Sequence, residues 1–163
     1  MESDPGRDDV DSTVRSATTI PDLMRTAARL AAVELSGDGC AISRILGDVL
    51  VELAEFAGTR KTLYLGHGYL ISDYPLTREV IERREPRTVY ALDADADAAE
   101  VALLAELGFN SLLMVPICAA DVVWGLAEIY REGIHRFVNT DAEEASRIFG
   151  LVGDRVAELE AER

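Results

Sequence analysis

Residues 111–130 read SLLMVPICAADVVWGLAEIY, and this stretch decides the fold. Its first part, residues 111–118, is too uniformly apolar for a strand at the edge of a sheet, so we expect it at the centre. A short turn at 119–121 leads back through a second strand, 122–130, which completes a hairpin. Gly125 in the middle of that strand predicts a bulge or a point where another group packs closely on the backbone.

A second hairpin lies upstream, preceded by a helix. Residues 40–46 and 49–56 read as two strands, and Gly47 with Asp48 between them suits a tight antiparallel turn. Residues 20–35 carry apolar side chains three and four apart, which predicts a helix packed along one face.

The remaining elements predict an α+β fold. We expect its central antiparallel sheet to have about five to six strands, with helices on both faces. Thr140 and Glu143 form a capping box at the start of the last helix. The other expected elements are a weak strand over 62–72, a helix over 75–85, a strand over 88–92 and a helix over 97–107.

The charge of the chain argues against two classes of partner. A net charge of -14 over 163 residues, with Lys61 as the single lysine, predicts binding to neither nucleic acid nor membranes. The first residues lack the pattern of a signal peptide, and no apolar run approaches the ~20 residues of a membrane span, so we expect a cytoplasmic protein. Cys40 and Cys118 lie in strand-like runs and read as small buried hydrophobic residues.

The N-terminal segment differs in composition from the rest. Residues 1–19 are rich in Asp, Ser, Thr and Gly and have few large apolar side chains, so we expect a mobile acidic tail. Residues 20–163 then form a single domain, large enough to bury a core of its own.

The second half of the chain resembles the closing part of GAF domains, a family related to PAS domains. The resemblance rests on the strand 111–116 that ends in Val-Pro, on Trp-Gly-Leu at 124–126, and on the loop 136–141 before the last helix. It extends over about residues 20–159 and implies a sensory domain of signal transduction.

The resemblance also implies a ligand pocket on one face of the sheet, covered by residues 74–107. A small molecule bound there would act through the first and last helices on a fused or separate output domain. Each candidate has an ordinary alternative role, in which its side chain fills core space and finds one hydrogen-bond partner. The candidate ligand-binding residues are His67, Tyr69, Tyr74, Tyr90, Asp93, Asn110, Ser111 and Trp124.

A second hypothesis makes the terminal helices the working surface of an interaction or dimerisation module. Apolar residues of the last helix alternate four and three apart, the spacing of a coiled-coil seam, so we expect a homodimer through the terminal helices. The expected interface consists of Leu23, Ala27, Ala145, Phe149, Val152 and Val156.

The ligand motifs of known GAF domains are not matched. Members that bind cyclic nucleotides have Glu where this chain has Ala142. Members that bind a bilin covalently have a cysteine followed by histidine, whereas Cys40 precedes Ala41 and Cys118 precedes Ala119. We therefore predict no cofactor.

A third hypothesis is a haem or redox sensor that uses His67. Free methionine sulfoxide reductases share the GAF fold, but the reactive cysteine that they need between positions 86 and 111 is missing from the sequence. The acidic run 93–97 lacks the Gly and Glu of an EF-hand and reads as a cap for the helix that follows. We expect no metal site, no catalytic residue and no enzymatic activity.

Overall fold

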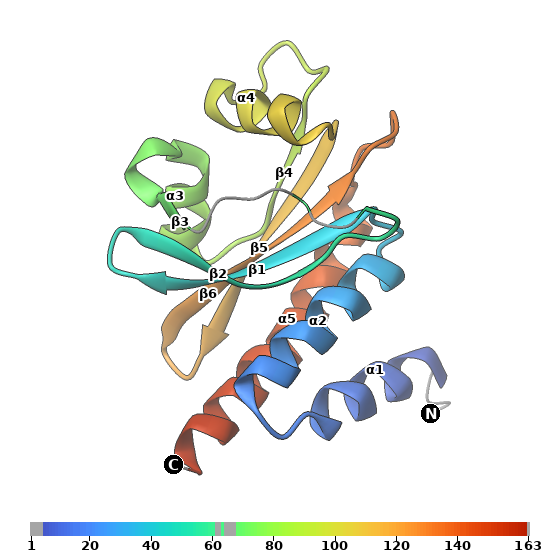
Figure 1. Ribbon diagram of the computed structural model, residues 1–163, viewed down its shortest axis with the longest axis vertical. Coiled ribbons are helices and arrows are strands. Elements are labelled where there is room, and N and C mark those ends of the chain that lie inside the picture. The colour runs from blue at the N-terminus through green and yellow to red at the C-terminus, as the bar shows by residue number, and fades with distance from the viewer. Residues whose placement is uncertain (1–4, 61–62, 64–67, 163) are drawn as a thin grey trace.

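The two expected hairpins form the middle of the sheet. The computed structural model describes residues 5–60, 63 and 68–162, and in this part of the chain six strands pair antiparallel in the order β3-β2-β1-β6-β5-β4 (Figure 1). β1 pairs with β6, so the two hairpins join into one sheet. The strands are β1 (Gly39–Leu46), β2 (Val49–Phe56), β3 (Gly68–Leu70), β4 (Arg87–Tyr90), β5 (Ser111–Ala119) and β6 (Val122–Arg131).

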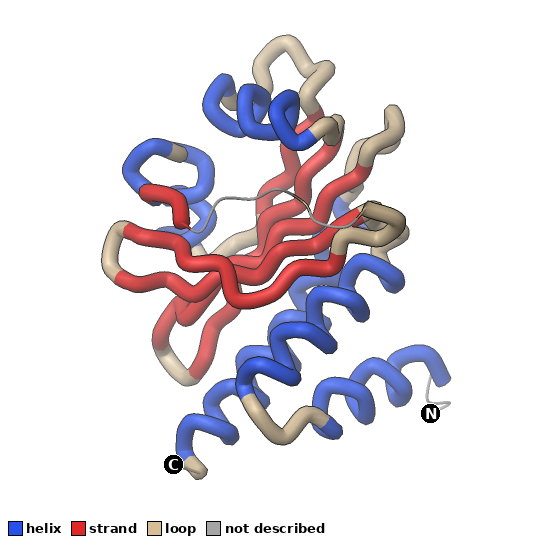
Figure 2. The backbone as a smooth tube through the Cα atoms, viewed as in Figure 1, coloured by secondary structure: helices blue, strands red, loops and turns tan. Residues whose placement is uncertain are grey.

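Helices cover both faces of the sheet, as the sequence predicts. α2 and α5 lie side by side on one face, which we call the α2/α5 face, while α3 and α4 lie over the other, the α3/α4 face (Figure 2). The helices are α1 (Pro5–Ser16), α2 (Ile20–Glu34), α3 (Pro75–Arg83), α4 (Ala98–Leu107) and α5 (Asn139–Ala161), with a 3₁₀ turn at Ile71–Asp73. The described helices include none with the length and apolarity needed to cross a membrane.

The apolar run of β5 contributes to two cores because successive side chains of a strand point to opposite faces. Leu113, Val115 and Ile117 pack under α2 and α5, whereas Leu112 and Met114 pack under α3 and α4. The strand lies inside the sheet between β4 and β6, as its uniform apolarity predicts.

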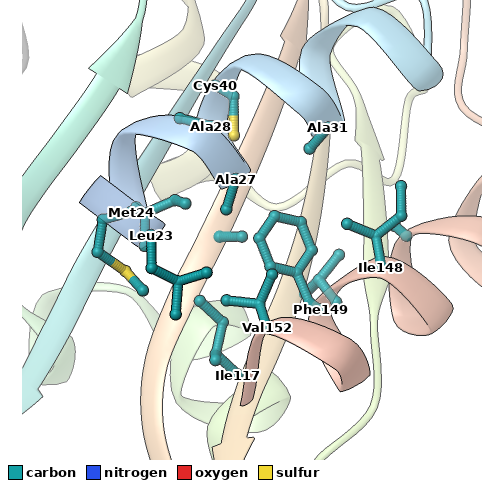
Figure 3. Packing of buried hydrophobic residues seen from close by; sticks show 14 of the residues in the cluster. Leu23, Met24, Ala27, Ala28, Ala31, Cys40, Ile117, Ile148, Phe149 and Val152 are labelled. Atoms are coloured by element: carbon teal, nitrogen blue, oxygen red, sulfur yellow. The ribbon is translucent and has the colours of Figure 1, made fainter. Parts of the chain in front are cut away.

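The seam predicted as a dimer interface lies inside the single chain, so that prediction is wrong. Phe149 and Val152 of α5 gather with Leu23 and Ala27 of α2 over Ile117 of β5 (Figure 3). Apolar spacing of three and four suits a helix that packs on a sheet as well as a coiled coil. The predicted interface residues, each at most 1% exposed, are Leu23, Ala27, Ala145, Phe149, Val152 and Val156.

The N-terminal segment is not the mobile tail that its composition predicts. From residue 5 onward it forms α1, which packs against α2 and α5, while residues 1–4 lie outside the described residues. Val10, Val14 and Ala17, four and three apart, are buried in this contact. Arg155 of α5 donates to the Ala17 carbonyl from Nε (3.1 Å) and Nη2 (2.9 Å). These three buried residues dock α1, although the average composition of the segment predicts no stable helix.

Two glycines mark places where backbones meet closely. A Cβ at Gly125 would collide with the carbonyl of Ser43 on β1, and the sheet register shifts beside it between Ile117 and Cys118. Both findings confirm the expectation for a glycine in mid-strand. A Cβ at Gly153 of α5 would collide with the carbonyl of Cys118 on β5. This contact explains why a long helix contains a residue of low helix propensity.

The capping residues of α5 lie two positions before those of the predicted capping box. The helix begins at Asn139, and the Asp141 carboxylate accepts the backbone N–H of Val138 at 2.8 Å. Asp141 thus provides the carboxylate that we had assigned to Glu143, and Thr140 lies inside the first turn.

We predict opposite effects for two glycine-to-alanine substitutions in α5. Gly153→Ala should lower the free energy of unfolding by about 1–3 kcal/mol, because the new methyl group forces α5 away from β5. Gly150→Ala is the matched control, since a Cβ there meets open space, and it should raise stability by up to ~1 kcal/mol. Urea denaturation followed by circular dichroism measures both, and equal stabilisation would contradict the close contact.

Candidate functional site

The α3/α4 face carries carboxyl groups among its apolar side chains. Glu52 on β2 lies opposite Ser43 of β1, and Glu128 on β6 lies opposite Ala41 of the same strand. Ser43 and Ala41 are two residues apart and therefore point to the same face, which places both glutamates there. β1 separates their strands, so the two backbones lie roughly 10 Å apart and their side chains extend over small residues of β1.

Glu100 adds a third carboxyl group from above, on α4. It is 1% exposed, and its Oε1 accepts the hydroxyl of Thr77 on α3 at 2.6 Å. Burial raises the pKa of Glu100; the Thr77 hydrogen bond acts against this and the charge of Asp97 adds to it. The contact joins the two helices that cover this face.

Glu128 is surrounded by protein and yet partly accessible. Desolvation raises its pKa to about 8, with smaller contributions from the charges of Glu100 and Glu52, while a hydrogen bond from the Tyr130 hydroxyl (3.1 Å to Oε2) opposes the rise. Leu126 and Tyr130, its neighbours on the same side of β6, are completely buried, whereas Glu128 retains accessible surface. Glu128 therefore keeps some contact with solvent, although its carboxyl group is strongly desolvated.

Glu52 completes the group and lacks a conventional partner. Its Oε1 is buried and accepts no N–H or O–H from the protein. Desolvation raises its pKa to about 8, followed by a hydrogen bond and charge repulsion from Glu55, and that hydrogen bond requires a proton on one of the two carboxyl groups. Glu55 in turn accepts the backbone N–H of Leu63 at 3.2 Å.

The groups that act on these carboxyls are acids and hydroxyls in the part of the chain that the structure describes. Tyr69, Tyr74 and Tyr130 belong to the same network, and burial is the largest cause of the raised pKa of Tyr74 and of Tyr130. Among the described residues, no basic side chain contributes to any of these pKa shifts. Lys61 and His67 lie outside the described residues.

Two of the predicted ligand-binding residues line a cavity beside the edge strand β4. This cavity has a volume of about 360 Å³. Asp93 pairs with Arg136 at 2.9 Å, and the same guanidinium lies 4.5 Å from the ring centre of Tyr90. The lining residues are Leu76, Arg87, Thr88, Val89, Tyr90, Asp93, Asp95, Ala96 and Asp97.

Two further candidates pair with each other near the cover of the α3/α4 face. The rings of Tyr69 and Tyr74 meet edge to face with their centres 5.9 Å apart. Both are partly exposed, and Tyr74 lies close enough to Glu100 for that charge to raise its pKa. Tyr69 and Tyr74 thus lie beside the carboxyl groups of the α3/α4 face.

The structure does not bring the other candidates to the same place. Asn110 Nδ2 donates to the carbonyl of Glu132 (2.6 Å), and Ser111 Oγ donates to the carbonyl of His135 (2.7 Å). Trp124 packs on the α2/α5 face, and His67 lies outside the described residues. Asn110 and Ser111 therefore hold loops, and Trp124 belongs to the opposite core.

Sequence reasoning missed the residues that give the α3/α4 face its chemistry. A signal was available in β6, where Glu128 stands alone in the otherwise apolar run 122–130, and in β2, where Glu52 interrupts VLVELAEF. An acid at the inward position of a buried strand is rare unless it is paired or functional. The missed residues are Glu52, Thr77, Glu100, Glu128 and Tyr130.

Cys40 does not offer a nucleophile on this face. Cys40 is completely buried on the α2/α5 face, and burial raises the pKa of its thiol. Its position does not fit covalent attachment of a pigment held under α3 and α4. The described residues include no group of three or more His, Cys, Asp or Glu side chains arranged to hold a metal ion.

Comparisons with known proteins agree with this architecture. A family model described as the GAF domain matches residues 19–157. A bacteriophytochrome of the photosynthetic bacterium R. palustris superposes with a TM-score of 0.83 at 12% sequence identity, over 96% of this chain and 37% of the other. The photosensory core module of Stigmatella aurantiaca phytochrome gives 0.82 at 16% identity, over 97% and 37%. The curated proteins contain no match.

These comparisons correct the expectation about cofactors. The chromophore-binding domain of the R. palustris bacteriophytochrome superposes with a TM-score of 0.82 at 13% identity, over 97% of this chain and 62% of that chain. Similar structures thus belong to domains that bind a chromophore, and the prediction of no cofactor, with haem on His67 as the alternative, is wrong. The chain spans between 37% and 62% of the length of these three similar structures.

The buried carboxyl groups predict a specific dependence of stability on pH. The pKa of Glu128 and that of Glu52 rise from an ordinary 4.5 to about 8 in the folded protein. Between these values the folded state binds more protons than the unfolded state, so stability is greatest below pH 4.5 from these groups and falls as the pH rises towards 8.

Glu128→Gln removes one of the two ionising groups and tests the prediction. Its stability relative to the unmodified protein should increase from pH 5 to pH 8, by on the order of 2 kcal/mol after allowance for the partial accessibility. Glu143→Gln, at an exposed position of α5, is the control and should show no such trend. Urea denaturation at each pH provides the measurement, and parallel curves for all three proteins would contradict the buried ionisation.

Proposed function

The chain belongs to the GAF domain family, and on this premise we propose that it is a non-catalytic sensory domain. It binds a small organic molecule on the α3/α4 face and passes the change through α2 and α5 to a fused or separate output domain. The single observation that supports this most is Glu128, an acid on the inward side of β6 whose pKa is raised by desolvation and which retains accessible surface.

A buried carboxyl group of this kind is energetically costly. A carboxyl group held in apolar surroundings without a cation lowers stability, and a core that serves only folding has no use for it. Glu52, Glu100 and Glu128 come from three different elements and converge on one face. Titratable groups whose pKa values are strongly raised by burial mark candidate binding sites.

β6 connects the proposed site with the terminal helices. Alternation along β6 turns Glu128 towards α3 and α4 and Ile129 towards α2 and α5. The register shift beside Gly125 brings Trp124, four residues before Glu128, to the α2/α5 face as well. The indole N–H of Trp124 donates to Glu160 near the end of α5 at 2.9 Å. A displacement of β6 by a ligand therefore acts on α5 directly, and it shifts the population of two states if the ligand binds one of them better.

Arg131 at the end of β6 makes a second connection. Its guanidinium donates to the carbonyls of Leu35, at the end of α2, and Arg136, in the loop before α5, at 2.6 and 3.1 Å. It also stacks on Phe137 at 3.9 Å from the ring centre. One side chain thus links the strand to both helices of the α2/α5 face.

A ligand screen by thermal unfolding tests this function. A compound at 100 times its dissociation constant adds about 2.7 kcal/mol of stability, which corresponds to a rise in Tm of several degrees in a domain of this size. Ala41→Leu should weaken every such shift, because Ala41 is a small residue of β1 on the α3/α4 face, opposite Glu128.

The matched control is Ala98→Leu at an exposed position of α4, which should leave ligand shifts unchanged. Stabilising compounds that act equally on both variants bind elsewhere, and this outcome would overturn the proposed site. The Tm of each ligand-free variant shows whether it is folded.

A further inference from the structure

We propose that the free edge of β4 binds an extended basic peptide segment of a partner protein. The segment adds to the sheet as a further strand and places a lysine or arginine side chain in the cavity beside β4. This surface is distinct from the carboxyl groups of the α3/α4 face, so the inference goes beyond the proposed function and does not depend on it.

β4 is the last strand of the sheet, and among the described residues no strand pairs with its outer edge (Figure 1). On its inner edge, the Ala91 N–H continues the pairing with β5 and donates to the Asn110 carbonyl at 2.8 Å. The backbone groups of an antiparallel strand alternate between its two edges, so every second residue before Ala91 also turns towards β5. Thr88 and Tyr90 therefore turn their backbone groups to the free edge.

The free edge offers hydrogen-bonding groups in the arrangement that a further strand needs. The Tyr90 carbonyl accepts the N–H of Asp93 at 3.0 Å, which leaves the N–H of Tyr90 and both the N–H and the carbonyl of Thr88. Thr88 is exposed. The N–H and carbonyl of one such residue pair with one residue of an added strand, as in peptide recognition by β-augmentation. Pro86, just before β4, has no N–H and limits the edge to a short segment.

The cavity of about 360 Å³ lies along the same strand. All four residues of β4 line it, together with Leu76 of α3 and residues of the segment 93–97. Its volume lies within the range of roughly 300–1,000 Å³ that is typical of ligand pockets. Side chains of an added strand alternate between the two sides of the sheet, so every second one lies on the side of α3. A long side chain on that side has space beside the peptide backbone.

The arginines at this cavity already have acidic partners. Arg87 pairs with Glu79 at 3.0 Å, and Arg136 pairs with Asp93 at 2.9 Å. Arg83 pairs with the same carboxyl group of Glu79 at 3.3 Å and does not line the cavity. The positive charges beside β4 are therefore offset by these contacts.

Two further carboxyl groups make the cavity acidic. Asp95 is exposed, and Asp97 accepts the backbone N–H of Glu100 at 3.1 Å through Oδ1. A lysine or arginine side chain in the cavity would gain charge-assisted hydrogen bonds from these groups. The same edge of a second copy would bring identical carboxylates against them, and like charges at an interface oppose association. The charge therefore favours a basic segment over a second copy of this chain.

Two peptides of opposite charge test the inference. The probe is the peptide Thr-Lys-Val-Lys-Val-Lys-Thr with blocked ends, whose lysines all lie on one side of an extended strand. The comparison peptide has glutamate in place of each lysine. Isothermal titration at low ionic strength should show binding of the lysine peptide that weakens with added salt, and none of the glutamate peptide. Binding of both peptides with equal affinity, or of neither, would overturn the proposal.

Two N-methylated forms of the lysine peptide separate strand addition from simple attraction between charges. One is methylated on the backbone nitrogens of its lysines and the other on those of its valines, so both keep the charge. Because consecutive N–H groups of a strand point to opposite edges, only one form blocks the edge that faces β4. That form should bind about tenfold more weakly, and the other should bind like the parent peptide. Equal affinity of the two forms contradicts strand addition.

Variants at Thr88 assign the binding to the edge of β4. Thr88→Pro removes the N–H that faces the free edge and leaves the pairing with β5 intact, so the affinity for the lysine peptide should fall about tenfold. Thr88→Val keeps this N–H and should bind as the unmodified protein does. Thermal unfolding shows that both variants are folded, and unchanged affinity of a folded Thr88→Pro would place the peptide elsewhere and refute the inference.

Amide hydrogen exchange gives a readout that needs no variant in the strand. The N–H groups of Thr88 and Tyr90 should exchange more slowly when the lysine peptide is bound, and unchanged exchange at both would contradict the added strand. Asp95→Asn should lower the affinity about threefold, whereas Asp154→Asn, at an exposed position of α5, should not. Equal effects of these two substitutions would contradict a basic side chain in the cavity. The ligand screen on the α3/α4 face decides the proposed function separately.

Discussion

The burial of β1, β5 and β6 on both faces is the constraint on which the rest of the structure depends. Each strand must supply apolar side chains to the α2/α5 core and to the α3/α4 core. Two glycines allow close approach of backbones, Gly125 between the neighbouring strands β6 and β1 and Gly153 between the layers formed by α5 and the sheet at β5. A carboxyl group in these strands is then largely desolvated, as the raised pKa of Glu128 indicates, and its burial lowers stability.

The two faces of the sheet differ in composition. The α2/α5 face is apolar and closely packed, with Phe149 and Val152 seated against α2 and the sheet. On the α3/α4 face Glu52, Glu100 and Glu128 stand among the apolar side chains, and the burial of their carboxyl groups lowers the stability of the domain. Natural proteins retain such destabilising groups where function requires them. β6 contributes side chains to both cores, so a displacement of this strand moves residues on both faces of the sheet.

Much of the fold could be predicted from the sequence, but less of the site. The two hairpins could be predicted because each consists of two apolar runs joined by a short turn, at Gly47 and Asp48 and at residues 119–121, and such signals are local in sequence. The apolar face of α5 at Phe149 was predicted to contact a second copy of the chain, whereas it packs on α2 and the sheet of the same chain. Periodicity shows that a helix face is buried, but it does not show which element covers that face. α1 was missed because three spaced apolar residues carry its docking. Glu128 was missed because two-sided burial hides the alternation that shows which way a strand residue points.

The contact at Gly153 has a mechanical consequence for α5. The helix backbone touches the sheet at this residue, with about 21 Å of helix before it and about 12 Å after it. If α5 tilts about this contact, its two ends move by unequal distances, in proportion to their distance from Gly153. The shorter arm carries Glu160, the partner of Trp124, while the longer arm begins beside the loop that Arg131 holds. A tilt driven at the shorter arm therefore produces the larger displacement at the N-terminal end of α5.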